Sequence, residues 1–119
     1  MKILIVDDSK AMRSIVRRHV SQAGFESADI AEAENGQEAL DSIRAARPDI
    51  VLSDWNMPVM TGIELLEAIG AESLDVPLGF VTSEHSDDFK ERAFDSGARF
   101  MIAKPFTAED FTRCLAPFA

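Results

Sequence analysis

Five short apolar runs alternate with longer segments of helical periodicity along the 119 residues of the chain. The runs contain mainly Ile, Val and Leu without regular polar positions, which is typical of parallel strands buried on both faces of a sheet. The second run is the weakest, because its Ala and Glu residues are poor strand formers. The five runs are Ile3–Val6, Ser27–Ala33, Ile50–Leu52, Leu78–Val81 and Phe100–Ala103.

The segments between the runs have the spacing of amphipathic helices, with apolar residues three and four positions apart. The clearest examples are Met12, Ile15, Val16 and Val20 after the first run and Phe111, Cys114, Leu115 and Phe118 after the last. Sequences that resemble capping boxes predict helix starts at 35–38, 61–64 and 107–110, and Gly24 and Gly97 lie where two helices should end. The pattern predicts one α/β domain over residues 1–119, a three-layer (βα)5 doubly wound parallel sheet.

Polar residues follow four of the apolar runs at the point where each run ends. In a sheet of this kind, ligands bind outside the carboxyl ends of the strands, where the strand order reverses. Polar groups at the same end of four strands are difficult to explain by chance, so we expect a single shared pocket. Its candidate residues are Asp7, Asp8, Asp54, Thr82 and Lys104.

The candidate pocket combines three carboxylates, which repel one another unless a cation joins them. Oxygen ligands favour Mg²⁺, and we expect Asp8, Asp54 and the backbone carbonyl of Asn56 to bind it directly. Asp7 would hold a metal-bound water or orient Asp8. A carboxylate such as Asp54, partly desolvated at a strand end, can attack phosphorus and form an aspartyl phosphate. The pattern therefore predicts Mg²⁺-assisted phosphoryl transfer to Asp54.

Two further residues complete the predicted chemistry. Lys104 would bring a compact positive charge to the phosphoryl oxygens, and Thr82 would donate a hydrogen bond to one of them after transfer. Pro105 permits a cis peptide bond after Lys104, which would direct the lysine side chain inward. Each signal also has an ordinary explanation, since Asp8 or Ser9 could simply cap a helix. Their joint placement at four strand ends favours the shared site.

Charge and cysteine content narrow the classes of partner. The chain carries 12 basic and 21 acidic residues, a net charge of −9, which argues against direct nucleic-acid binding. The single cysteine, Cys114, excludes an intrachain disulfide and fits a reducing compartment. Neither a signal peptide nor a membrane-spanning stretch is visible in the sequence. We therefore expect a cytoplasmic monomer without a membrane partner.

Six short motifs make the chain resemble the response regulator receiver domains of bacterial two-component systems, and within them most closely the stand-alone chemotaxis regulators. The resemblance extends from Lys2 to about Leu115. It implies a flavodoxin-like fold with strand order 2-1-3-4-5. The motifs are Ile5-Val-Asp-Asp-Ser9, Asp54-Trp-Asn-Met-Pro58, Gly62-Ile-Glu-Leu-Leu66, Val81-Thr-Ser83, Gly97-Ala98 and Lys104-Pro-Phe106.

The resemblance implies a role for each candidate residue. Asp54 would be the phosphoacceptor, Asp7 and Asp8 the acidic pair for Mg²⁺, Thr82 the switch hydroxyl and Lys104 the phosphoryl-contacting lysine. The phosphodonor would be a histidine kinase or a histidine phosphotransfer domain. The face built from the fourth helix, fifth strand and fifth helix would bind an output protein, with the flagellar motor switch as first candidate. The chain would then be a signalling protein rather than an enzyme, apart from its own phosphorylation and dephosphorylation.

Three positions bear on how such a switch would work. The family usually has Tyr or Phe three residues before the lysine, where this chain has Met101, with Phe100 on the opposite side of the strand. Methionine can fill the same space but offers no hydroxyl. Coupling to the output face would therefore run through Thr82, Met101 and Pro105 without a hydroxyl at position 101. Asn56 and Glu84 occupy positions that tune phosphoryl lifetime in the family, and they predict a short-lived phosphoryl group.

Other functions are compatible with parts of the pattern. Met101 is compatible with an adaptor or phosphate sink that accepts phosphate without driving an output, and the chain could also be a receiver from a larger regulator. A phosphohydrolase of the haloacid dehalogenase type also uses an aspartate nucleophile with Mg²⁺. That chemistry needs a second carboxylate two residues after the nucleophile, where this chain has Asn56.

Side chains outside the predicted pocket give weaker signals. Lys10, Arg13 and Arg17, with Arg18 beside them, would form a basic stripe that is either a solvated helix face or a docking surface for the phosphodonor. His19 and His85 are not placed to form a metal site. Trp55 follows the nucleophile and is expected to be partly exposed, and Cys114 is expected in the core.

Overall fold

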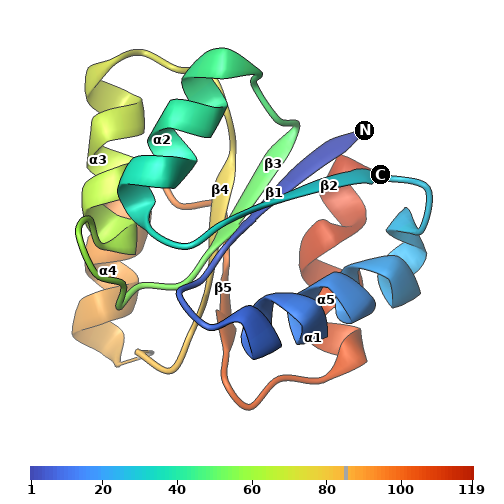
Figure 1. The fold of residues 1–119 in the computed structure, drawn as a ribbon. Helices are drawn as coiled ribbons and strands as arrows, with labels where there is room; N and C mark the ends of the chain where they lie inside the picture. Colours follow the sequence, from blue (N-terminus) through green and yellow to red (C-terminus); the bar gives the residue numbers. More distant parts are fainter. Residues whose placement is uncertain (85) are drawn as a thin grey trace.

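A five-stranded parallel sheet runs through the middle of the molecule (Figure 1). The structure, a computed structural model, describes residues 1–84 and 86–119, so His85 lies outside the described residues. The strand order is β2-β1-β3-β4-β5, which confirms the expected topology and the doubly wound α/β fold. The strands are β1 (Lys2–Val6), β2 (Asp29–Ala33), β3 (Ile50–Ser53), β4 (Leu78–Thr82) and β5 (Met101–Ala103).

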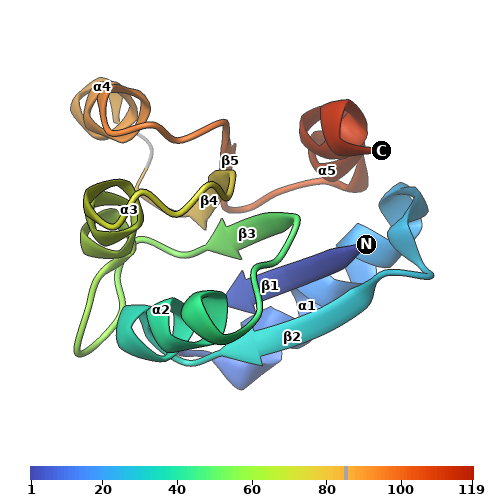
Figure 2. The ribbon, with the colours of Figure 1, turned by 90° about the horizontal axis from the view of Figure 1, so that it is seen from above.

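The helices cover both faces of the sheet (Figure 2). Seen from above, α1 and α5 lie on one face, and α2, α3 and α4 lie on the other. No helix in the described part of the chain is long and apolar enough to cross a membrane. The helices are α1 (Lys10–Val20), α2 (Gly36–Ala45), α3 (Gly62–Ala71), α4 (Asp87–Asp95) and α5 (Ala108–Leu115).

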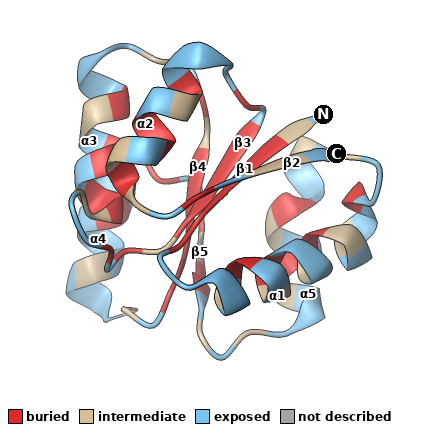
Figure 3. Ribbon diagram, viewed as in Figure 1, coloured by how far each residue is buried: buried red, intermediate tan, exposed pale blue. Residues whose placement is uncertain are grey.

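The apolar runs are continuous because successive side chains enter two different cores. On β1, Leu4 and Val6 pack with α2 and α3, whereas Ile3 and Ile5 pack with α1 and α5. β3 and β4 are therefore buried along their whole length, and β1 is buried at every residue except Lys2 (Figure 3). β2 differs because it is an edge strand and is largely half-exposed. Its position explains why the second run is so weakly apolar, and its regular part starts at Asp29, two residues later than predicted.

Side-chain caps fix where the helices begin. Thr61 and Thr107 form complete capping boxes with the residues three positions later, as predicted. Asn35 accepts from the backbone N–H of Glu38, but the Glu38 carboxylate turns to the backbone N–H of Glu34, so the third box is only half formed. Gly24 and Gly97 have φ of 101° and 106°, the left-handed conformation that ends helices. The α1 helix continues to Gly24 through a π-helical turn, Ser21–Phe25.

Two glycines of α3 provide a matched test of how closely this helix packs on the sheet. A Cβ on Gly62 would lie 2.2 Å from the Asp54 carbonyl oxygen and 2.8 Å from the Phe80 ring, whereas one on Gly70 would meet nothing within 4 Å. We expect Gly62→Ala to lower the free energy of unfolding by about 1–3 kcal/mol. We expect Gly70→Ala to raise it by about 0.5–1 kcal/mol. Urea unfolding of both variants checks this, and equal effects would contradict the close approach at Gly62.

Candidate functional site

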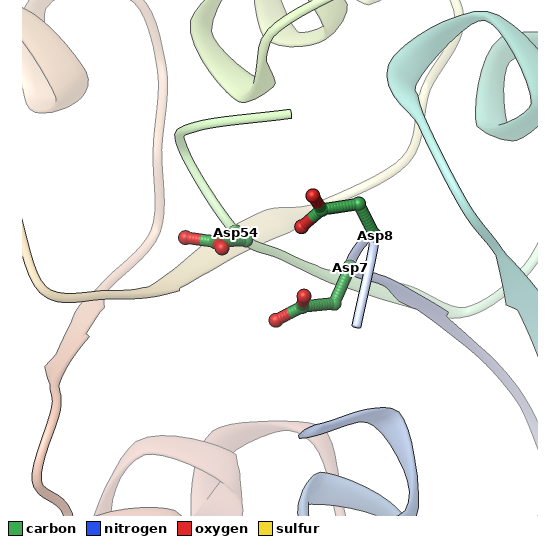
Figure 4. A group of neighbouring side chains, drawn as sticks. All are labelled: Asp7, Asp8 and Asp54. Carbon is green, nitrogen blue, oxygen red and sulfur yellow. The ribbon is translucent and has the colours of Figure 1, made fainter. Parts of the chain in front are cut away.

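Three carboxylates converge at the carboxyl ends of β1 and β3 (Figure 4). Oxygens of Asp7, Asp8 and Asp54 lie within 4.8 Å of one another. The two strands are neighbours, and the Asp54 N–H donates to the Val6 carbonyl at 2.9 Å, which extends the sheet register up to the cluster. The chain leaves β1 for β2 on one side, whereas β3 lies on the other side. The cluster therefore lies at the point where the strand order reverses, the expected place for a ligand.

A lysine from the end of β5 reaches the same cluster. Lys104 Nζ lies 3.3 Å from Asp7 Oδ2 and 3.4 Å from Asp54 Oδ2. Its backbone N–H donates to the Thr82 carbonyl at 3.0 Å, which anchors the chain just after β5. The Lys104–Pro105 peptide bond is cis, as predicted. Segments nearly a hundred residues apart in sequence thus contribute one cation and two carboxylates to one contact.

Asp7 is the most buried member of the cluster. It is 3% exposed, and burial raises the pKa of its carboxyl above the ordinary value, with the Asp54 charge adding to the rise. Hydrogen bonds from Ser9 N–H and Lys104 act in the opposite direction without cancelling it. Because the raised pKa favours the protonated acid, this group stabilises the fold at low pH, and the contribution is lost as pH rises through the folded pKa. Above that pH the ionised Asp7 carboxylate adds a negative charge that favours a bound cation.

The donor set fits a hard divalent cation. All three side chains offer carboxylate oxygens, the ligands that Mg²⁺ prefers, and Asp8 is exposed to solvent so that water can complete the coordination. The exposed Asn56 follows Asp54 by two residues in the adjoining loop. The described residues therefore form a candidate Mg²⁺ site, and the Asn56 carbonyl stays a predicted ligand.

The loops after β3 and β4 are joined by a contact between Asn56 and Glu84, which sequence analysis had paired only by their expected effect on phosphoryl lifetime. Asn56 Nδ2 donates to Glu84 Oε1 at 3.1 Å. The Glu84 N–H in turn donates to Thr82 Oγ1 at 3.1 Å. Thr82 itself is fully buried at the end of β4. The predicted switch hydroxyl is thus held by the backbone of the same loop that carries Glu84.

Met101 and Phe100 occupy opposite sides of the sheet, as predicted from the period of a strand. Met101 is half-buried and packs in the core between the sheet and helices α2, α3 and α4. Phe100 packs in the core on the other face, between the sheet and helices α1 and α5 (the α1–α5 core). Phe100 also lies against Gly79, where an added Cβ would come within 2.2 Å of its ring. Because the Phe100 ring is closely packed against Gly79 on its own face of the sheet, it cannot take the position of the Met101 side chain on the other face.

Two expectations near the site are wrong. Trp55 is 4% exposed rather than partly exposed, because its ring turns into the core and lies 4.9 Å from the rings of both Phe80 and Phe89. The basic stripe on α1 is broken, because Arg13 is buried and shares Glu32 of β2 with Arg17.

Cys114, which was expected in the core, is half-buried and packs against the α1–α5 core.

Sequence analysis named Ser9 only as an alternative helix cap and Arg13 only as part of a basic stripe, and it missed the contacts that both residues make with Asp7. Ser9 caps α1 and donates its N–H to Asp7 Oδ1 at 2.9 Å, so one residue fixes both the helix start and a carboxylate. Arg13 Nη1 donates to the Asp7 carbonyl at 2.6 Å. The available signal was the position of a charged residue, Arg13, on the apolar face of the helix that follows the acidic pair.

Comparison with known proteins agrees with this arrangement. The family model described as "Response regulator receiver domain" matches residues 3–116. The chemotaxis protein CheY of Pseudomonas aeruginosa is 40% identical over 111 residues, which cover 92% of this chain and 88% of that protein. The structure of Vibrio cholerae chemotaxis protein CheY4 has 35% identity and a TM-score of 0.85, covering 99% of this chain and 98% of that one.

A receiver domain from a different kind of regulator has the same fold. The signal receiver domain of the putative response regulator NarL from Mycobacterium tuberculosis has 25% identity and a TM-score of 0.87, covering 98% of this chain and 94% of that one. The structural match therefore includes a receiver domain that is not named as a chemotaxis protein. The chain belongs to the response regulator receiver domain family of two-component signalling proteins.

Proposed function

We propose that this chain is a phosphorylation-dependent switch in which Asp54 accepts a phosphoryl group from a histidine kinase or a histidine phosphotransfer domain. The output is a protein partner that binds the face formed by α4, β5 and α5, in chemotaxis or motility signalling. The carrying observation is the cluster of Asp7, Asp8 and Asp54 with Lys104 Nζ between two of its carboxylates. The chemotaxis names of the relatives support the choice of pathway.

In the proposed reaction, an Asp54 carboxylate oxygen forms a bond to phosphorus as the phosphorus–nitrogen bond of the phosphohistidine breaks. The electron pair of that bond leaves with the imidazole nitrogen, and the product is an aspartyl phosphate. The Asp54 side chain is 12% exposed, so it is partly desolvated yet open to a donor. Mg²⁺, when bound by the acidic cluster, would neutralise charge on the phosphoryl oxygens. Lys104 brings a second positive charge to the same place.

The direct test is the intact mass of the unmodified chain after incubation with Mg²⁺ and a small acyl phosphate such as acetyl phosphate. We expect a gain of one phosphoryl mass that requires Mg²⁺, because the anionic cluster repels an anionic donor unless it is neutralised. Following the mass after the donor is removed tests the short lifetime predicted from Asn56 and Glu84. Persistence for many hours in Mg²⁺ would contradict that lifetime, and no gain by a folded protein would contradict the proposed chemistry.

One observation favours a second candidate, an adaptor or phosphate sink. Met101 lies half-buried on β5, where the output face would need a group that responds to the phosphoryl. A methionine offers a partner no hydroxyl. In this reading the chain accepts phosphate as above, but phosphorylation leaves affinity for every output partner unchanged.

A further inference from the structure

Arg13 is a buried cation next to the acidic cluster that has no part in the proposed phosphoryl transfer. It lies on α1 and is 7% exposed. Its Nη1 donates to the Asp7 carbonyl at 2.6 Å, and its Nε donates to Glu32 Oε1 at 2.8 Å. Buried charges are tolerated where they are paired and hydrogen-bonded. The guanidinium is therefore fixed between a carboxylate of β2 and a carbonyl just after β1.

The carbonyl that Arg13 holds belongs to the peptide unit between Asp7 and Asp8. The Asp7 carboxylate has its own anchors, since Oδ1 accepts from Ser9 N–H and Oδ2 lies against Lys104. Asp8 differs, because no described residue donates a hydrogen bond to its carboxylate and the residue is exposed. Since a peptide unit is planar, its orientation sets the direction in which the next side chain leaves the backbone. The position of the Asp8 carboxylate thus depends on the peptide that Arg13 holds.

We propose that Arg13 is a positioning residue for the divalent-cation site, which it serves by holding the Asp7–Asp8 peptide so that Asp8 faces Asp7 and Asp54. The inference rests on the proposed function, because it assumes that the cluster binds Mg²⁺. Groups that orient metal ligands in this way change metal affinity by roughly 10–100-fold when they are removed. Arg13 is unusual in that its charge has the opposite effect, since a cation near the site disfavours a second cation.

The opposite signs make the inference testable by calorimetric titration of the unphosphorylated chain with Mg²⁺. Arg13→Met removes the donors and the charge but keeps an unbranched apolar stem. If Arg13 positions Asp8, the Kd for Mg²⁺ should rise by roughly tenfold. If its charge were the dominant effect, the Kd should fall instead. A Kd that is unchanged or lower in a folded Arg13→Met protein would overturn the inference.

Arg17→Met is the matched control. Arg17 lies on the same helix and shares Glu32, but its side chain is half-exposed, and among the described residues it donates a hydrogen bond only to Glu32. Because an exposed charge is largely screened by salt, we expect the Kd for Mg²⁺ to change by less than about twofold. An equal weakening in both variants would overturn the inference, since it would show that loss of the shared ion pair, not of the bond to Asp7, is responsible.

A second variant keeps the test valid if Arg13→Met does not fold. Arg13→Lys retains the charge but replaces the planar fork by a single point donor, which cannot span Glu32 and the Asp7 carbonyl in the same way. Weakened Mg²⁺ binding is expected here too, measured at a temperature where circular dichroism shows native structure. A lower Tm with a wild-type Kd would mean a purely structural role and would overturn the inference. If the wild-type chain binds no Mg²⁺, the proposed function fails as well, which distinguishes the two failures.

Discussion

Asp54→Asn should abolish phosphorylation of this chain by an acyl phosphate. The substitution keeps the shape of the side chain but removes the carboxylate oxygen that would attack phosphorus, and an amide is a far weaker nucleophile. In intact-mass measurements with Mg²⁺, we expect the phosphoryl gain of the wild-type chain and none in the variant. Affinity for Mg²⁺ should also fall, because one of the three converging carboxylates is lost.

Asp75→Asn provides the matched control for that experiment. Asp75 is exposed between α3 and β4 and lies outside the acidic cluster, so the same chemical change should leave the mass gain intact. A phosphoryl gain that persists in Asp54→Asn would place the acceptor at another residue and would contradict the proposed chemistry. Loss of the gain in both variants would point to a general effect of charge on the donor.

The strands were predictable from the sequence because most of them carry a simple physical signal. A continuous apolar run such as Ile3–Val6 predicts a strand that is buried on both faces, and the structure shows the two cores that bury them. The strand order 2-1-3-4-5 came from the family resemblance, since periodicity alone does not order parallel strands. The apolar signal of β2 was weak because β2 is an edge strand, in which only Ala33 of the five residues is buried.

The position of the acidic cluster was also predictable, because strand ends of a parallel sheet share one edge. The contacts that hold it were not, since they depend on where individual side chains turn. Trp55 was expected to be partly exposed because it follows the candidate nucleophile Asp54, yet its ring lies in the core against Phe80 and Phe89. Arg13 was assigned to an exposed stripe by its spacing, but its bond to the Asp7 carbonyl depends on a tertiary contact that spacing does not encode.

Lys104→Met should separate Mg²⁺ binding from the response to phosphorylation. Methionine retains much of the apolar stem but removes the ammonium that lies between Asp7 and Asp54. Without Mg²⁺, the carboxylates lose a neutralising partner, and Tm should fall by roughly 5 °C, equivalent to about 1 kcal/mol. Added Mg²⁺ should then raise Tm by more in the variant than in the wild-type chain, because it relieves a larger repulsion and binds only the folded state.

The same variant should accept a phosphoryl group slowly and respond to it poorly. Loss of one positive group that stabilises the transition state typically lowers the rate by roughly 10²–10³-fold, so the mass gain should appear late rather than never. Lys104 also joins the site to the segment after β5, where its N–H bonds the Thr82 carbonyl. Without its ammonium, the charge on the phosphoryl has no direct attraction for that segment. The NMR shift of the Met101 amide on phosphorylation should therefore lose most of its wild-type size.

Lys90→Met is the control for the lysine experiment, because Lys90 is an exposed residue of α4 outside the acidic cluster. It should phosphorylate at the wild-type rate and keep the Met101 shift. If Lys104→Met keeps both as well, the lysine has no part in transfer or switching. If it phosphorylates slowly yet keeps the full shift, the signal reaches β5 without the lysine, and the hydrogen-bonded link from Thr82 to Glu84 and Asn56 becomes the route to test. Separating rate from shift thus shows whether this chain can switch with methionine at position 101.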